Sequence, residues 1–311
     1  MRTLLSLLVL TIFSARVLGS DSGCLEDQNA TVSQRQTNKN QVTKITFDGR
    51  LKHDPVFVDD GKSIVYTSLE KFNQLCLMKV PFSPGHKPKP VRFHGAANTS
   101  ELMASFSKNP DIYAFLRNNG NLHFEIILEN KITGKSTSYN PGGGFAGIRN
   151  ISYAPDGQNV IFAFPNQNGP QQIQALSKDG KSNLLLTNSE GVNGCPKYSP
   201  DGKQIVFSSS RDGDFDIFVM NSDGSMPVNV SKSKGLETHP CFSPDGKQIA
   251  FTAIRNGHYN IYLMNADGSN VRKLTKHPEV DDYPCWSPDG KTIVWVGERE
   301  GQKDLYSIEI N

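Results

Sequence analysis

Short clusters of alternating hydrophobic and polar residues recur along the chain from residue 41 to its end. In the stretch 248–252 (QIAFT), Ile249 and Phe251 fall on one face, and the stretches 260–264 (NIYLM) and 271–275 (VRKLT) follow at short intervals. Turn-forming triplets such as Arg-Asn-Gly and Ala-Asp-Gly separate them. A period of two between turn signals predicts β-strands joined by hairpins, and no helical period competes with it.

The same cluster of strands and turns repeats along the chain, and this self-similarity is the strongest signal in the sequence. Three copies are close, beginning CPKYSPDGKQIVF at Cys195, HPCFSPDGKQIAF at His239 and YPCWSPDGKTIVW at Tyr283. An Asp anchors one turn in every copy, with spacings of 51, 45, 45, 44 and 44 residues, at Asp60, Asp111, Asp156, Asp201, Asp245 and Asp289. Six copies therefore account for almost all of residues 41–311.

Each copy contains four predicted strands, and a four-stranded unit of this length is typical of a propeller blade. One blade cannot bury both faces of its sheet, so the blades must stack in a ring. The sequence thus predicts an all-β, six-bladed propeller over residues 41–311. The last copy ends before its fourth strand. Residues 42–47 (VTKITF) resemble a fourth strand, and we predict that they complete the last blade and close the ring.

The first forty residues differ from the repeats. A basic start, an apolar run over 4–13 and small residues up to Ser20 predict a secretory signal peptide over residues 1–20, followed by a polar leader over 21–40. The apolar run is too short to span a bilayer, and no other segment approaches eighteen apolar residues. We therefore expect an exported protein, periplasmic or secreted, without a membrane span.

Overall charge excludes one class of partner. The chain has 33 basic and 31 acidic residues, a formal net charge of +2, and this balance gives no electrostatic basis for nucleic-acid binding. Five cysteines without a C-x-x-C motif argue against a thioredoxin or zinc-ribbon site. Cys241 and Cys285 hold the same place in adjacent copies, where the separation is too long for a disulfide, so we expect free thiols; the odd count leaves room for one disulfide elsewhere.

The motif S-P-D-G-K-x-I, then R-x-G, then D-I-[FY]-x-M-N-x-D-G-S, resembles the WD40-like repeat of the TolB-type β-propeller superfamily. The resemblance covers residues 41–311 and is strongest from Cys195 onward. It implies a non-catalytic binding module whose partner is an envelope protein or lipoprotein. The chain departs from TolB at its N-terminus, where a short polar leader replaces an α/β domain. Prolyl-oligopeptidase-type peptidases have similar repeats, but the chain contains no G-x-S-x-G motif.

Propellers bind ligands at the mouth of the central channel, and we place the mouth just before each innermost strand. The candidates with polar or aromatic chemistry are His53, Asp54, Glu237, His239, Asp281, Asp282 and Tyr283. Asn193 and Cys195 take the same place in the fourth copy. The second and third copies offer only Met103, Ser105, Ile148 and Asn150. We therefore expect one side of the mouth to lack charged, imidazole and aromatic side chains.

Three interpretations of this cluster remain open. The side chains solvate a loop rim, or they bind a partner, or they hold a metal through His53, His239 and a carboxylate from Asp54, Glu237 or Asp281. The metal interpretation corresponds to a propeller enzyme of the polysaccharide-lyase or lactonase type. We favour partner binding by a monomeric protein that is not an enzyme and has no metal or other cofactor.

Overall fold

The computed structural model describes residues 41–71, 74–95, 99–118, 124–142, 147–166 and 169–310. The predicted signal peptide (1–20) and leader (21–40) lie outside this part of the chain. Contacts between residues group Lys39–Asn311 into one unit. In the described residues the regular structure is β-strand, apart from the short 3-10 turn η1 (Asp59–Gly61). None of the helices in this part is long and apolar enough to cross a membrane.

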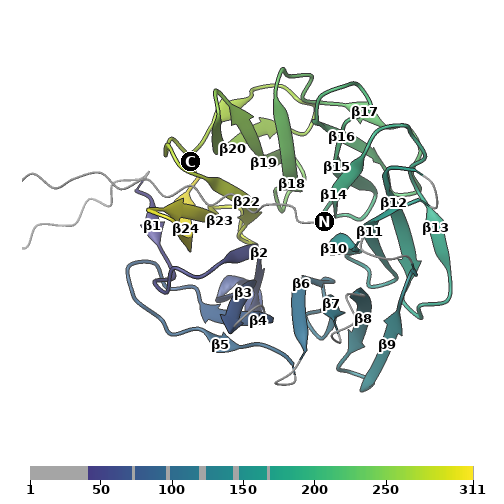
Figure 1. Cartoon of the computed structure of the whole chain (residues 1–311), viewed down its shortest axis with the longest axis horizontal. Coiled ribbons are helices and arrows are strands. Elements are labelled where there is room, and N and C mark those ends of the chain that lie inside the picture. Colours follow the sequence, from purple (N-terminus) through teal and green to yellow (C-terminus); the bar gives the residue numbers. More distant parts are fainter. Residues whose placement is uncertain are drawn as a thin grey trace, which may run out of the picture. The chain divides into compact units, whose positions relative to one another are not determined.

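The strands form six antiparallel, four-stranded sheets, which are the blades of a β-propeller (Figure 1). Blade 1 consists of β2 (Lys52–Val58), β3 (Ser63–Lys71), β4 (Gln74–Pro81) and β5 (Val91–Arg92). Blade 2 consists of β6 (Ser100–Phe106), β7 (Ile112–Asn118), β8 (Phe124–Asn130) and β9 (Lys135–Tyr139). Blade 3 consists of β10 (Arg149–Tyr153), β11 (Asn159–Pro165), β12 (Gln171–Ser177) and β13 (Asn183–Leu185). The fold class predicted from the repeat is confirmed.

The remaining blades follow the same order. Blade 4 consists of β14 (Asn193–Tyr198), β15 (Gln204–Ser209), β16 (Asp216–Asn221) and β17 (Val228–Asn229), and blade 5 of β18 (Leu236–Phe242), β19 (Gln248–Arg255), β20 (His258–Asn265) and β21 (Arg272–Lys273). Blade 6 consists of β22 (Asp281–Trp286), β23 (Thr292–Arg299) and β24 (Gln302–Glu309), and its fourth strand is β1 (Thr43–Lys44). The first strand of each blade contacts the first strand of the next, and β22 contacts β2, so the ring is complete.

The hydrophobic core is divided among the interfaces between blades. Each of the six buried apolar clusters contains side chains from two neighbouring blades. Between blades 5 and 6, for example, Ile261 and Leu263 pack with Trp286 and Trp295. This arrangement explains why the repeat must form a ring, because each blade has two apolar faces and only neighbouring blades can cover both.

The Ser-Pro-Asp-Gly motif forms the turn between the first two strands of blades 4, 5 and 6. In blade 5 the Ser243 hydroxyl donates to Asp245 Oδ1 at 2.6 Å, and Gly246 N donates to the Ser243 carbonyl at 2.9 Å. Gly246 has a φ of +73°, which glycine adopts without steric cost. The motif is repeated because the same turn must return the chain at the same angle in each blade.

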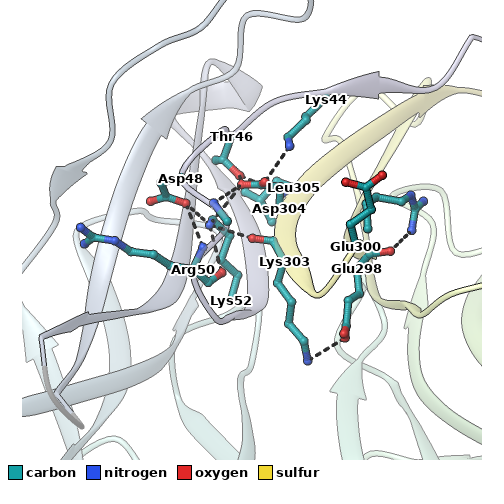
Figure 2. Close-up of polar contacts among 12 residues, drawn as sticks. Lys44, Thr46, Asp48, Arg50, Lys52, Glu298, Glu300, Lys303, Asp304 and Leu305 are labelled. Carbon is teal, nitrogen blue, oxygen red and sulfur yellow. Dashed lines mark hydrogen bonds and ion pairs between the residues drawn. The ribbon is translucent and has the colours of Figure 1, made fainter. Parts of the chain in front are cut away.

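Strand β1 adds to the open edge of blade 6, where Thr43 pairs with Ser307 and Lys44 with Tyr306. A buried charge network accompanies this pairing (Figure 2). Asp304 accepts a hydrogen bond from Thr46 Oγ1 at 2.7 Å and forms ion pairs with Lys44 Nζ at 2.8 Å and Lys52 Nζ at 3.3 Å. Lys52 and Asp304 are both fully buried. The network therefore joins the start of blade 1 to the end of blade 6.

Candidate functional site in the central channel

The first strand of every blade contains a β-bulge at the same place in the repeat. The register of its pairing with the second strand shifts there, and one non-glycine residue has a φ between +49° and +58°. These six residues, which we call the bulge residues, are Asp54, Met103, Asn150, Cys195, His239 and Tyr283. A non-glycine residue in this region costs of order 1–3 kcal/mol, and bulges redirect side chains near functional sites.

Five of the six bulge residues line one pocket, because the bulges bring them together from different blades. Its empty volume is about 330 Å³, part of which is open to solvent. Its lining consists of Asp54, Asn150, Cys195, His239 and Tyr283, together with Lys197, Pro55, Pro240 and Pro284. Met103 is the bulge residue that does not take part. We refer to this recess as the channel pocket.

His239 and Asp282 form the most highly organised polar pair beside the pocket. Nδ1 of the imidazole lies 2.7 Å from Asp282 Oδ1, which also accepts hydrogen bonds from Thr252 Oγ1 at 2.7 Å and Tyr283 N at 2.8 Å. Burial opposes the charged imidazole, but Asp282 and the Cys195 thiolate raise the pKa of His239 well above its usual value. Burial likewise opposes the Asp282 carboxylate, whose pKa is nevertheless lowered by His239.

Cys195 lines the same pocket as His239. Its Sγ atom is 3.4 Å from Thr238 Oγ1, on the residue that precedes His239 in β18, and 3.5 Å from Asn150 Oδ1. Burial alone would raise the pKa of this thiol, but the charge and hydrogen bond of His239 lower it below the ordinary value. The pKa values of Cys241 and Cys285, in the same channel-side strands, are raised by burial.

A second imidazole–carboxylate pair lies in blade 1. His53 Nδ1 is 2.6 Å from Asp54 Oδ2, and burial of Asp54 is outweighed by His53, so the pKa of this carboxyl is lowered. The Tyr283 ring lies between the two imidazoles, with its centroid 6.0 Å from that of His53 and 4.1 Å from that of His239. One member of each acid–base pair, Asp54 and His239, therefore lines the channel pocket together with Tyr283 and Cys195, whereas His53 and Asp282 lie behind them as their partners.

Two predicted site residues, Glu237 and Asp281, lie elsewhere. Both are buried and precede the bulge residue by two positions. Glu237 accepts from Arg255 at 2.9 Å and Asp281 from Arg299 at 2.7 Å. In two other blades the residue two positions before the bulge residue also pairs with the equivalent arginine. These pairs are Glu101 with Arg117 and Asn193 with Arg211. We call these four residues the arginine-paired row, and in blades 2, 4, 5 and 6 they fasten the first strand to an arginine at or just beyond the end of the second.

The structure corrects where the candidates lie. The sequence placed them in loops just before the innermost strands, but His53 and Asp54 lie inside β2, His239 inside β18, and Asp282 and Tyr283 inside β22. Each innermost strand begins two or more residues earlier than expected because its first part pairs before the bulge. The proline after the bulge residue in four blades accordingly lies at the bulge, where a ladder hydrogen bond is already interrupted.

The arrangement of Cys195, His239 and Asp282 was not foreseen from the sequence. A signal was present, because residues 195, 239 and 283 are spaced by 44 and hold the same place in the repeat. The sequence did not show that these positions are bulged and therefore meet across blades. Of the thiols in the described residues, Cys76, Cys195, Cys241 and Cys285 are all free, which confirms the prediction made for Cys241 and Cys285. Cys24 lies outside the described residues.

The histidines of the channel each face a carboxylate partner. His53 is paired with Asp54, and His239 with Asp282. Among the residues that the structure describes, no group of three or more His, Cys, Asp or Glu side chains has the arrangement of a metal site.

Comparison with known proteins agrees with the fold. A family model described as the TolB beta propeller domain matches residues 183–275 and 227–311. Dipeptidyl-peptidase 5 of Porphyromonas gingivalis is 32% identical over 78 residues, which are 22% of this chain and 11% of that protein. The match thus spans about a tenth of the length of that relative.

Similar solved structures include both TolB proteins and enzymes. A protein described as putative TolB from Agrobacterium tumefaciens has a TM-score of 0.64 at 22% identity, covering 84% of this chain and 91% of that one. A gluconolactonase from Xanthomonas campestris has a TM-score of 0.63 at 11% identity, covering 88% and 91%. An oligogalacturonate lyase from Vibrio parahaemolyticus has a TM-score of 0.57 at 13% identity, covering 89% and 95%. At these identities the similarity concerns the fold alone.

Proposed function

We propose that this chain, a TolB-like β-propeller, is a binding module that holds a segment of a partner polypeptide in the channel pocket. The observation that carries the proposal is the convergence of bulge residues from five blades on one recess. Six strained positions are maintained round the ring, and strain of this kind persists where it positions side chains for a purpose. Binding of a partner accounts for these six strained positions without requiring a chemical reaction.

The chemistry of the pocket suits a peptide. Lys197 and His239 supply positive charge, Asp54 supplies negative charge, and Tyr283 offers an aromatic face between prolines. A polypeptide segment presents donors, acceptors and apolar groups in alternation and can use all of these at once. We propose that the partner is an envelope protein or lipoprotein. We also propose that this chain is an exported monomer that binds its partner in the periplasm or outside the cell.

The test compares capture and affinity in wild-type protein and pocket variants. The purified protein is immobilised and incubated with an envelope extract, the captured protein is identified by mass spectrometry, and the purified pair is measured by calorimetry. His239→Ala and Lys197→Ala should each weaken binding by about tenfold or more, since truncation of a central interface residue removes 1–2 kcal/mol. Lys247→Ala, which removes an exposed lysine from a blade 5 turn, should leave the affinity unchanged.

Two outcomes would reject this proposal. Affinity that is insensitive to both pocket variants would place the interface elsewhere on the propeller. Turnover of a lactone or a polysaccharide, with one metal ion per chain that is lost together with activity in His239→Ala, would instead establish the metal-dependent enzyme. Metal content and activity are measured on the same preparations used for the binding assay.

A further inference from the structure

We propose that Cys195 is a nucleophilic thiol, activated by His239 and oriented through Asp282, that forms mixed disulfides with small organic disulfides entering the channel pocket. The inference goes beyond partner binding and does not rest on it. It concerns a covalent modification site formed by three side chains from three neighbouring blades. Cys195 comes from β14, His239 from β18 and Asp282 from β22.

The geometry is that of an activated nucleophile. Asp282 Oδ1 takes the hydrogen bond of His239 Nδ1 at 2.7 Å, so Nε2 is the ring nitrogen left for Cys195. Cys195 Sγ lies 3.4 Å from Thr238 Oγ1, on the residue before His239, and both Cys195 and His239 line the channel pocket. Thr252 Oγ1 and the backbone N–H of Tyr283 fix the carboxylate in turn. A nucleophile in contact with a base that a third group orients is the arrangement found in nucleophilic catalysis on unrelated folds.

The pocket also gives the thiol access to solvent and to reagents. Cys195 is a lining residue and is half-buried, and 18% of the His239 side chain is exposed. The bulge backbone of both residues has positive φ, which holds the two side chains at the axis rather than in a blade interface. An accessible thiol beside a cationic imidazole has the environment of a reactive cysteine.

Titratable and charged groups from the neighbouring innermost strands surround this pair. They are His53 and Asp54 of β2, Arg149 of β10, Lys197 of β14, and Asp282 and Tyr283 of β22. His239 is the charged residue that lowers the pKa of Cys195 most, whereas Lys197 contacts the Ile151 carbonyl through its Nζ at 3.5 Å. The thiolate is therefore paired chiefly with His239, and Asp282 keeps that imidazole protonated.

The reaction is a thiol–disulfide exchange. The Cys195 thiolate attacks one sulfur of the incoming disulfide, a new S–S bond forms, and the old S–S bond breaks. The electron pair leaves on the second sulfur as a thiolate, which takes a proton from the His239 imidazolium or from water. The disulfide is reduced to one free thiol while Cys195 is oxidised to the mixed disulfide. Acyl transfer would also require an oxyanion hole, whereas exchange needs only the thiolate and a proton source.

The matched internal controls are Cys241 and Cys285. Both lie on innermost strands, two residues after a bulge residue, and Cys241 Sγ donates to the Pro284 carbonyl at 3.1 Å rather than to an imidazole. They share the channel-side strands and the fold with Cys195 but lack its His239 contact. Because Cys195 also lines the pocket and the other two thiols do not, differences in reactivity report the imidazole together with access, and His239→Gln separates the two.

The experiment measures the rate at which each cysteine of the folded protein reacts with hydroxyethyl disulfide, with acid quenching and peptide mass mapping from about pH 5 to 9. At pH 7, Cys195 should react about tenfold or more faster than Cys241 and Cys285, with a midpoint below that of a free thiol. His239→Gln should slow Cys195 at pH 7 by about tenfold and move its midpoint upward. Asp282→Asn, a change at a positioning residue, should give a smaller shift in the same direction.

Two controls separate activation from exposure and from misfolding. Lys247→Gln removes an exposed lysine from a blade 5 turn outside the pocket and should change the rate by less than about threefold. Circular dichroism confirms the fold of each variant, and the wild-type pH profile stands independently of all of them. The proposal is overturned if Cys195 reacts no faster than Cys241 at pH 7, or if its midpoint is that of an ordinary thiol.

Discussion

Two rows of side chains lie on the innermost strands, two residues apart, and they behave differently. The arginine-paired row, which includes Glu237 and Asp281, is buried and fastened to the second strand of its own blade. The row of bulge residues, which includes His239 and Tyr283, meets other blades at the channel pocket. In a regular strand, positions i and i+2 share one face, so the β-bulge between them is what separates a structural row from a chemical one.

This difference shows that residue type alone did not determine the role of a side chain. Asp281 and Asp282 are adjacent carboxylates on β22. Asp281 accepts from Trp295 Nε1 at 2.8 Å and from Arg299, inside blade 6. Asp282 reaches across to His239 of blade 5. In blade 1 the equivalent position carries a positive charge instead of an acceptor. Buried Lys52 lies there and pairs with Asp304 near the closing strand (Figure 2).

The largest effect is expected from Asp304→Ala. It removes the acceptor shared by Thr46, Lys44 and buried Lys52, and breaking a buried ion pair costs about 4 kcal/mol in the free energy of unfolding. Denaturant unfolding monitored by tryptophan fluorescence measures the loss. The control is Glu309→Ala, which removes an exposed carboxylate from the same strand and should cost less than about 0.5 kcal/mol. Equal losses would show that the network contributes little.

Asp281→Ala should destabilise the protein by about 3 kcal/mol, because the Arg299 and Trp295 donors lose their acceptor inside blade 6. The double variant Asp281→Leu with Arg299→Met removes both charges and should cost less than the single change. The same unfolding assay gives both values. A double variant that is less stable than the single one would contradict a purely structural role for this ion pair.

A smaller effect is expected at a bulge residue. Cys195→Gly places glycine at a φ of +51°, so relief of backbone strain offsets the added entropy of the unfolded chain, and stability should change by no more than about 1 kcal/mol. Asn193→Ala, two residues earlier, removes buried hydrogen bonds to Arg211 and Gln172 and should cost about 2 kcal/mol. If Cys195→Gly were the costlier change, the distinction between the two rows would fail.

The smallest effect is a pH dependence. The folded-state pKa of His239 is raised above 6.5, so its contribution is complete below pH 6.5 and is lost as the pH rises through the folded-state value. The pKa of Asp282 is lowered below 3.8, so its contribution is lost only as the pH falls through that lower value. The stability difference between wild type and His239→Gln should therefore be largest between about pH 4 and 6.5 and decline at alkaline pH.

The measurement is urea unfolding of both proteins at pH 5.5 and 9. The control is His258→Gln, at an exposed residue at the start of β20, run under the same conditions. A difference between wild type and His239→Gln that is constant over this range would mean that the imidazole charge does not contribute to stability.

Part of the site could be predicted from the sequence. The repeat identified positions 54, 239 and 283 as equivalent, and all three line the channel pocket. Glu237 and Asp281 were grouped with them because they are nearby polar residues. Only the contacts with Arg255 and Arg299 show that they belong to the interior of their blades. A repeat period fixes which residues are equivalent, but it does not give the direction in which a side chain points.

The sequence by itself determined the six blades, their four strands and the Ser-Pro-Asp-Gly turns, because alternation, period and turn chemistry are local properties of the chain. Only the tertiary structure decided that Cys195, His239 and Asp282 meet. Their contact depends on a bulge in each innermost strand and on the angle at which three blades pack. Both are set by burial of apolar faces between blades, which is a property of the closed ring and not of any single repeat.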